Sequence, residues 1–340
     1  MRVVFVNDSG SFDGFTPYER ALDGPEKALA NLATALAMRG HNVIVCNGST
    51  LPVEAHGVRW QSADAPPEAA DVLVACRDPA RLDFMANVAR RVFWACGAVA
   101  PGAGAHASLA THRPTVVLSS QAQQAAWSGP ADAEATVIEP GIAAPFLEDA
   151  PMAPVEPPRA IATAHPLAGL DWLVKLWQER IHPELPQATL HLYSAWLDTS
   201  RSGGAVPPAI KPVADQVAAA EKQGIVIERP RADPQMAEAY RQARVHLHPA
   251  AASDTFGFTL QESQAIGLPA VVRATNAVMT ERVSDGQTGA IAAGDPNFAG
   301  AAIKLLSDRM AFDQMSANAR HLKRGRSWAV AAAEWEARFA

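Results

Sequence analysis

The sequence predicts an α/β protein made of two doubly wound domains joined by a proline-rich link. Three observations support this fold class. Short apolar runs alternate with helix-like segments through the first half of the chain, prolines gather in residues 144–158, and the alternation restarts after them. Strands that are apolar along their whole length are typical of parallel sheets covered by helices on both faces. With 340 residues, 49% of them hydrophobic, the chain can bury two such cores.

The N-terminal segment contains a complete unit of strand, helix and strand. Residues 3–6 form one short apolar run and residues 43–45 form another. Between them we expect a helix that starts within Gly24-Pro25-Glu26, with Pro25 at the first helical position, and that Gly40 closes. Because a single helix connects the two strands, they are expected to be parallel neighbours in one sheet.

The same patterns predict the remaining elements. Further strands are expected at residues 71–74, 91–95, 115–119, 136–138, 160–163, 189–193, 225–227, 245–248 and 270–273. Helices are expected at residues 79–90, 121–127 and 258–266, and the end of the chain, residues 311–340, is helix-like throughout. We therefore expect domains at residues 1–145 and 159–315. Helices in 316–340 either pack on the second domain or cross back to the first.

Composition narrows the function classes. A net charge of −6 disfavours non-specific binding to nucleic acids or to anionic membranes. The three cysteines, Cys46, Cys76 and Cys96, are odd in number and widely spaced, which argues against a disulfide framework and indicates a reducing, cytoplasmic compartment. No apolar run approaches the ~20 residues of a membrane span, so no transmembrane segment is expected. Peripheral attachment to a membrane stays open.

The stretch from Asp254 to Gly267 carries the strongest chemical signal. It predicts a loop followed by a helix whose first N–H groups and partial positive charge suit an anion, and Gly257 leaves room for its close approach. Glu262, one turn into the helix, is placed to accept hydrogen bonds from ribose hydroxyls, and Asp254 to face a sugar. The alternative is structural: Asp254 caps the helix and Glu262 complements its dipole.

The same stretch resembles the signature of the GT-B glycosyltransferases called group 1, or family four. That pattern is an acidic residue, any residue, Phe-Gly, four residues, Glu, and then Ala-x-Ala-x-Gly-x-Pro. Here the match runs through Asp254, Phe256, Gly257, Glu262, Ala265, Gly267 and Pro269. The tripeptide from Gly24 to Glu26 is similar to the family's glycine-rich loop before the first helix. The resemblance implies a GT-B fold with a central cleft, a nucleotide-sugar donor, and transfer with retained configuration.

The resemblance also implies residue roles. Asp254 is expected to be the catalytic residue that positions the sugar. Donor contacts are expected from Gly24, Pro25, His165, Phe256, Gly257, Phe258, Thr259 and Glu262. No metal or cofactor is expected, since the sequence holds no Asp-x-Asp pair and the helix dipole and basic side chains would stabilise the leaving diphosphate. The acceptor stays open between a sugar, a lipid-linked molecule and a small molecule.

Three departures from the family pattern bear on activity. Asp254 replaces the usual glutamate, and Ala168 replaces a basic residue, which leaves His165 as the cation of that loop. Ala95 stands where close relatives have a histidine that touches the donor sugar. These changes favour an alternative: a nucleotide or nucleotide-sugar binding protein with little or no transfer activity. A third hypothesis, an NAD-dependent dehydrogenase, is disfavoured because no Gly-x-Gly-x-x-Gly follows the first strand.

Overall fold

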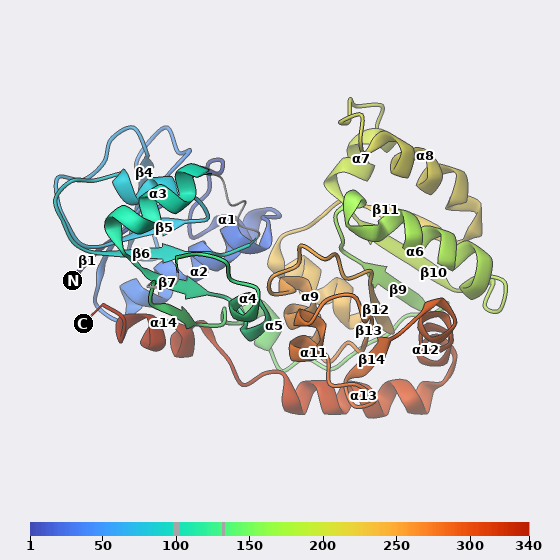
Figure 1. The fold of residues 1–340 in the computed structure, drawn as a ribbon. Helices are drawn as coiled ribbons and strands as arrows, with labels where there is room; N and C mark the ends of the chain where they lie inside the picture. Colours follow the sequence, from blue (N-terminus) through green and yellow to red (C-terminus); the bar gives the residue numbers. More distant parts are fainter. Residues whose placement is uncertain (98–102, 131–132, 340) are drawn as a thin grey trace. The chain divides into compact units, whose positions relative to one another are not determined.

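The structure of the chain is a computed structural model that describes residues 1–97, 103–130 and 133–339. It contains two compact units, one formed by Met1–Ala143 with Arg326–Ala340 and the other by Ala144–Gly325. Each unit holds one sheet with helices packed against it (Figure 1). The sequence placed the domain borders at 145 and 159 and began the terminal helical segment at 316, whereas the units divide at Ala144 and Arg326.

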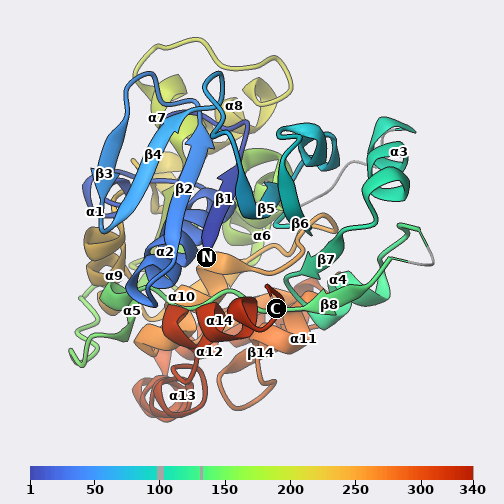
Figure 2. The same cartoon turned by 90° about the vertical axis from the view of Figure 1, so that its left-hand side faces the viewer.

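The first unit is built on an eight-stranded sheet in the order β3-β4-β2-β1-β5-β6-β7-β8. Figure 2 shows β3 and β4 at one end of this sheet and β7 and β8 at the other. Its strands are β1 (Arg2–Val6), β2 (Asn42–Asn47), β3 (Val53–Ala55), β4 (Val58–Ser62), β5 (Ala70–Cys76), β6 (Val88–Trp94), β7 (Thr115–Leu118) and β8 (Ala135–Val137). All neighbours are parallel except β3 and β4.

The helical elements of the first unit flank this sheet. They are α1 (Thr16–Glu19), α2 (Gly24–Met38), η1 (Pro79–Asp83), α3 (Ala103–His112), α4 (Gln121–Ala125) and α14 (Trp328–Glu336). The predicted start of α2 within Gly24-Pro25-Glu26 is confirmed, and the carboxylate of Asp23 caps the helix by accepting a hydrogen bond from the Glu26 N–H at 2.7 Å. Its apolar face is buried, as the predicted helical spacing requires.

Two predictions for the first unit are wrong. The helix expected at residues 79–90 is only the short turn η1, because the chain enters β6 at Val88, where it pairs with Ala70 of β5. The sequence analysis also missed the antiparallel hairpin of β3 and β4. Its two-residue turn, His56-Gly57, has positive φ at both residues, 52° and 77°, which is the geometry that joins tightly paired antiparallel strands.

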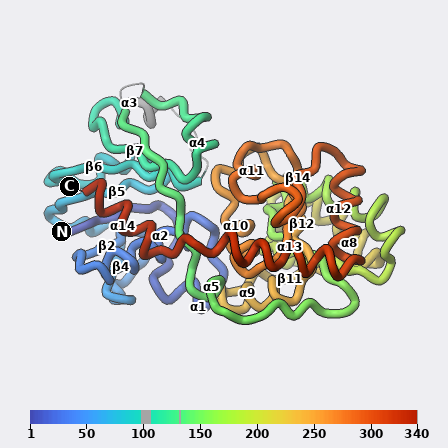
Figure 3. Tube along the Cα trace, turned by 90° about the horizontal axis from the view of Figure 1, so that it is seen from below, coloured from blue at the N-terminus to red at the C-terminus, as the bar shows by residue number. Residues whose placement is uncertain are grey.

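The end of the chain belongs to the first unit. Helix α14 lies beside α2 (Figure 3), and its Trp335 meets Trp94 of β6 edge-on with ring centroids 5.1 Å apart. The returning segment docks on the turn at Gly141, where a Cβ atom would lie 2.5 Å from the Trp328 backbone nitrogen. Of the two alternatives for residues 316–340, α14 takes the return to the first unit, while α13 (Arg309–Leu322) stays in the second.

The second unit is built on a six-stranded parallel sheet in the order β11-β10-β9-β12-β13-β14. Its strands are β9 (Arg159–Ala162), β10 (Thr189–Tyr193), β11 (Ile225–Glu228), β12 (Val245–His248), β13 (Ala270–Arg273) and β14 (Gly289–Ala292). The sequence analysis missed β14. Gly289 is required there, since a Cβ atom at this position would lie 2.0 Å from the carbonyl oxygen of Ala270 on β13.

Helical elements connect these strands and enclose a continuous apolar core. They are α5 (Ala144–Leu147), η2 (Pro166–Leu170), α6 (Asp171–Leu176), η3 (Trp177–Ile181), α7 (Ala195–Arg201), α8 (Lys211–Ala220), η4 (Glu221–Gln223), α9 (Asp233–Arg241), α10 (Phe258–Ile266), α11 (Val278–Arg282), α12 (Asp295–Ser307) and α13. The proline-rich link at 144–158 was expected to be non-helical, but it begins with the one-turn helix α5. In the described part of the chain, no helix is long and apolar enough to cross a membrane.

Candidate functional site

The strand order of the second unit places a switch point between β9 and β12. From β9 the chain adds β10 and β11 on one side, and from β12 it adds β13 and β14 on the other. Loops that leave the carboxyl ends of two such strands diverge and form a crevice where ligands bind in doubly wound sheets. Here these loops approach each other closely, since a Cβ atom on Gly169 would lie 3.1 Å from Cβ of Pro249.

Helix α10 begins beside this crevice, with the bounds that the sequence predicted. Its N-terminal flanking residue, Gly257, is left-handed, with φ 76° and ψ 56°. A side chain at this position would be strained, and its Cβ would lie 3.3 Å from Cγ of Arg282. Gly257 is therefore needed for the backbone turn that begins α10, in addition to any close approach of a ligand.

The two aromatic residues beside Gly257 lie differently. Phe256 is only 1% exposed, and its ring contacts Phe258 and lies under the guanidinium of Arg282, at 4.8 Å between ring centroids and 4.4 Å respectively. Phe256 thus anchors the loop in the core, and only its backbone is available to a ligand. Phe258 and Thr259, in the first turn of α10, are half-buried. Arg282 is a buried cation at this helix start. The sequence analysis did not identify it, because it lies on α11, which is separated from α10 along the chain by β13.

Glu262 is buried on α10, with 8% of its surface exposed. Its negative charge adds to burial in raising the pKa of the nearby Tyr240 phenol well above its usual range. A buried carboxylate is costly unless polar groups offset its lost hydration. Glu262 lies one turn inside a helix that starts at the crevice, and its expected ribose contact stays a prediction.

Asp254 lies in the loop between β12 and α10, and its Oδ2 is 3.7 Å from Nε2 of His248, at the end of β12. Burial raises the pKa of Asp254 to about 6 and lowers the pKa of His248 to about 4. The His248 Nδ1 accepts a hydrogen bond from the backbone N–H of Ala250 at 3.0 Å, so the ring presents an Nε2–H toward the carboxyl group. The sequence analysis did not identify this neighbour of Asp254.

The loop that carries Asp254 is held by hydrogen bonds from the segment that follows β13. Asn276 donates from Nδ2 to the carbonyl oxygens of Asp254 at 2.7 Å and Ala251 at 3.0 Å, and Thr275 donates from Oγ1 to the carbonyl of Ala250 at 2.6 Å. Ala250 itself is left-handed, with φ 55°, a costly geometry for a residue with a side chain. These bonds hold Asp254 in place, and nothing near it in sequence signals them.

A second histidine ties the crevice strands to α10. His246 is fully buried on β12, with Nε2 3.2 Å from the Thr163 hydroxyl beyond β9 and Nδ1 2.9 Å from the Ser263 hydroxyl of α10. Burial holds its pKa well below the usual range, so the ring is neutral. The described residues contain no cluster of three or more metal-ligating side chains. His246 thus links β12 to the residue after β9 and to α10; metal independence stays a prediction.

His165 lies on the loop after β9, where the sequence analysis expected a cation. The side chain is exposed, and its Nδ1 accepts a hydrogen bond from the Leu167 N–H at 3.2 Å, so the ring caps the turn η2. Ala168 is half-buried and precedes the left-handed Gly169, whose φ is 86°. A charged role for His165 toward a diphosphate stays a prediction, while its role in the turn is visible.

Gly24 and Pro25 lie in the first unit, at the start of α2. There the ring of Pro25 borders Gly97, whose Cβ would lie 3.4 Å from Cγ of the proline. Nearby, Asp23 forms an ion pair with Arg77, a residue with a left-handed backbone (φ 69°), at 3.4 Å. The donor contacts expected of Gly24 and Pro25 stay a prediction.

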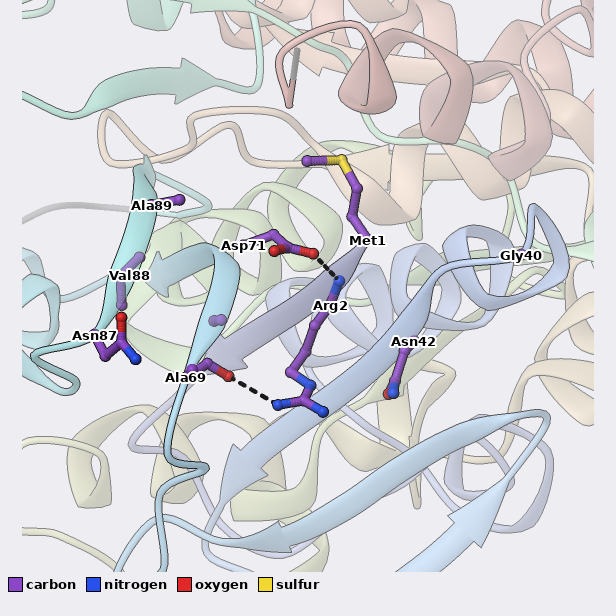
Figure 4. A pocket seen from close by; sticks show the side chains of 10 residues that line it. Met1, Arg2, Gly40, Asn42, Ala69, Asp71, Asn87, Val88 and Ala89 are labelled. Carbon is purple, nitrogen blue, oxygen red and sulfur yellow. Dashed lines mark hydrogen bonds between the residues drawn. The ribbon is translucent and has the colours of Figure 1, made fainter.

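A hollow of about 610 Å³ lies elsewhere in the first unit. Figure 4 shows its lining, which lies at the amino ends of the strands of this unit's sheet. There the Arg2 backbone N–H donates to Asp71 at 2.6 Å, and the Arg2 side chain donates to the carbonyl oxygen of Ala69 at 3.4 Å. Ligands of doubly wound sheets bind at the carboxyl ends of strands. We therefore do not assign this hollow to the site.

Comparison with known proteins agrees with this geometry. Residues 160–308 match the family model described as Glycosyl transferases group 1. That match contains both crevice loops and all of α10, so the resemblance found in the sequence is confirmed for the second unit. No curated protein matches the chain.

Solved structures confirm the fold class over nearly the whole chain. Sucrose-phosphate synthase from Thermosynechococcus elongatus is 14% identical with a TM-score of 0.74, covering 99% of this chain and 97% of its own. Anabaena HepE, solved in complex with UDP and glucose, is 17% identical with a TM-score of 0.72, covering 99% and 98%. WaaG, a glycosyltransferase involved in lipopolysaccharide biosynthesis, is 14% identical with a TM-score of 0.68, covering 98% of each chain. The fold is that of the GT-B glycosyltransferases.

Proposed function

We propose that this protein is a retaining glycosyltransferase that moves a sugar from a nucleotide-sugar donor to an acceptor without a metal ion. The observation that carries the proposal is the switch-point crevice of the second unit. There a helix starting at the left-handed Gly257 brings Asp254 and Glu262 to one loop and helix, within the segment that matches the group 1 model. HepE, which shares the fold, is a complex with UDP and glucose.

Each residue of the crevice has a proposed part in this reaction. The N–H groups at the start of α10 bind the donor diphosphate and stabilise its departure. Glu262 accepts hydrogen bonds from the ribose, and Asp254 holds the transferred sugar. Asp254 performs this part best as a carboxylate, a pure acceptor of hydroxyl hydrogen bonds, and so above its pKa of about 6. Donor contacts of Gly24 and Pro25, which lie in the first unit, stay a prediction.

The primary test is a thermal-shift screen against UDP, GDP, ADP and their sugar conjugates, with and without EDTA. A ligand at about 100 times its Kd stabilises the native state by about 2.7 kcal/mol, a readily measured shift. We expect one nucleotide class to stabilise the protein equally in both conditions. Loss of all binding in EDTA would refute metal independence. The anomeric configuration of a transfer product, read by NMR spectroscopy, tests retention.

A binding protein with little or no transfer is the second candidate, and Ala95 is the observation that favours it. Its side chain is fully buried at the end of β6, and its carbonyl oxygen accepts a hydrogen bond from Gln123 at 2.7 Å. The methyl side chain of Ala95 cannot form a hydrogen bond to a donor sugar, whereas the family that the sequence resembles has a histidine there. Tight nucleotide-sugar binding without release of nucleotide, across a panel of sugar, lipid-linked and small acceptors, would support this candidate.

We also propose that the protein resides in the cytoplasm. All three cysteines are buried, unpaired thiols, which agrees with a reducing cytoplasm. Fractionation of cells that express the protein tests this, and recovery with membranes released by high salt would indicate peripheral attachment.

A further inference from the structure

Arg273 is a cation at the carboxyl end of β13 whose guanidinium forms no hydrogen bond or ion pair with the residues that the structure describes. Its guanidinium carbon lies 4.2 Å from the centroid of the Trp172 ring. Within the part of the chain that the structure describes, this cation–π contact is the one polar interaction of the guanidinium. The side chain is half-buried. A guanidinium that lies over an aromatic ring can still donate from its N–H groups to an acceptor at its edge.

Arg273 reaches the crevice at the switch point. A Cβ atom on Gly169, in the loop after β9, would lie 3.9 Å from Nη1 of Arg273 and 3.1 Å from Cβ of Pro249, in the loop after β12. The guanidinium therefore lies against the loop of one crevice strand where that loop touches the other. This is the edge of the sheet at which doubly wound folds bind their ligands.

The tryptophan beneath Arg273 is itself fixed. Trp172 donates from Nε1 to Oδ1 of Asp295 at 3.0 Å, and its ring meets Phe298 edge-on with centroids 5.0 Å apart. In the part of the chain that the structure describes, Asp295 forms no ion pair with Arg273, so it holds the tryptophan and leaves the guanidinium charge unpaired. The cation is thus held in place before any ligand arrives, which lowers the entropy cost of binding.

We propose that Arg273 binds the diphosphate of the donor, taking the part of the basic residue that the loop lacks at Ala168. This inference rests on the proposed function for the identity of the donor, and on the geometry above for the residue. A guanidinium offers paired donors that match two phosphate oxygens, and it remains charged throughout the physiological pH range. Arg273 therefore provides a permanent cation beside the loop that lacks a basic residue at Ala168.

The test measures, by isothermal titration, affinity for inorganic pyrophosphate, for the nucleoside diphosphate preferred in the thermal screen, and for its nucleoside. Arg273→Gln should weaken both diphosphate ligands by about 10- to 100-fold, the usual loss for a charged hydrogen bond, and leave the nucleoside unchanged. Arg180→Gln, at an exposed arginine of the same unit, is the matched control and should change none of the three.

Two further variants separate binding from a structural role. Adding Ala168→Lys to Arg273→Gln should restore much of the lost affinity, since the lysine joins the same loop next to Gly169. Trp172→Leu should weaken diphosphate binding, whereas Trp172→Phe, which keeps a ring beneath the guanidinium, should retain most of it. A structural role would instead alter the melting temperature and shift all three affinities together.

The outcomes distinguish this inference from the proposed function. Nucleotide binding that is insensitive to Arg273→Gln overturns the role of Arg273 and leaves the function standing. Pyrophosphate binding that depends on Arg273, without binding of any nucleotide, supports the residue and overturns the function. Wild-type protein that binds neither pyrophosphate nor nucleotide overturns both.

Discussion

Asp254 and His248 should give the folding stability of this protein two opposite dependences on pH. Asp254 is 30% exposed and His248 8% exposed at the side chain, and burial shifts both pKa values toward the neutral form. The pKa of Asp254 rises from 3.8 to about 6, and the pKa of His248 falls from 6.5 to about 4. Between pH 4 and 6 both groups are therefore neutral in the folded chain and charged in the unfolded chain.

The sign of each effect follows from proton uptake. For Asp254 the folded chain keeps a proton that the unfolded chain releases, so its contribution is full below pH 3.8 and is lost as pH rises through about 6. For His248 the unfolded chain takes up a proton that the folded chain refuses, so its contribution is full above pH 6.5 and is lost as pH falls through about 4.

The two contributions are similar in size. At 1.36 kcal/mol for each pKa unit, Asp254 changes the free energy of unfolding by about 3 kcal/mol and His248 by about 3 kcal/mol across this range. In the wild-type protein the two nearly cancel between pH 4 and 6. Asp254→Asn should leave the His248 effect alone, so that stability rises with pH, and His248→Gln should leave the Asp254 effect alone, so that stability falls.

The assay is urea unfolding followed by circular dichroism, at half-unit steps from pH 4 to 8, with each variant compared with the wild type. Asp215→Asn is the control, because Asp215 is 63% exposed in its ion pair with Lys211. A difference between Asp254→Asn and the wild type that stays constant across these pH values would refute the reasoning, since the carboxyl would then titrate alike in both states.

The remaining predictions concern the helix start, the ribose and the returning C-terminus. Glu262→Gln should weaken nucleotide binding by about 1–3 kcal/mol in a folded variant, and an unchanged titration would exclude a ribose contact. Gly257→Ala should lower the free energy of unfolding by about 1–2 kcal/mol because φ is 76°, and a neutral urea midpoint would contradict this. Trp335→Ala should cost about 3–5 kcal/mol by emptying its place against Trp94; an unaltered melting temperature would show that α14 is dispensable.

Local patterns in the sequence were sufficient for the elements whose causes are local. Helix α2 starts at Gly24 because Asp23 and Pro25 are adjacent to it, and α10 has its predicted bounds because Gly257 and Gly267 are both left-handed at its ends. The apolar runs that predicted parallel strands lie in the two sheets. The same pattern placed Asp254 and Glu262 on one loop and helix, since their separation along the chain is short.

The remainder depended on partners that are distant in sequence. The helix expected at 79–90 gave way to β6 because Val88 pairs with Ala70, and helical and extended patterns cannot be separated without that partner. Likewise, α14 was placed by Trp94, which lies far from it along the chain.

The crevice shows the same difference between features with local causes and features that depend on residues distant in sequence. Asn276 holds the Asp254 loop, and Arg273 reaches Gly169, because neighbouring parallel strands bring their carboxyl ends together. The sequence showed that a basic residue is missing at Ala168. It could not show which cation lies beside that loop, because only the lateral order of β9, β12 and β13 brings Arg273 there.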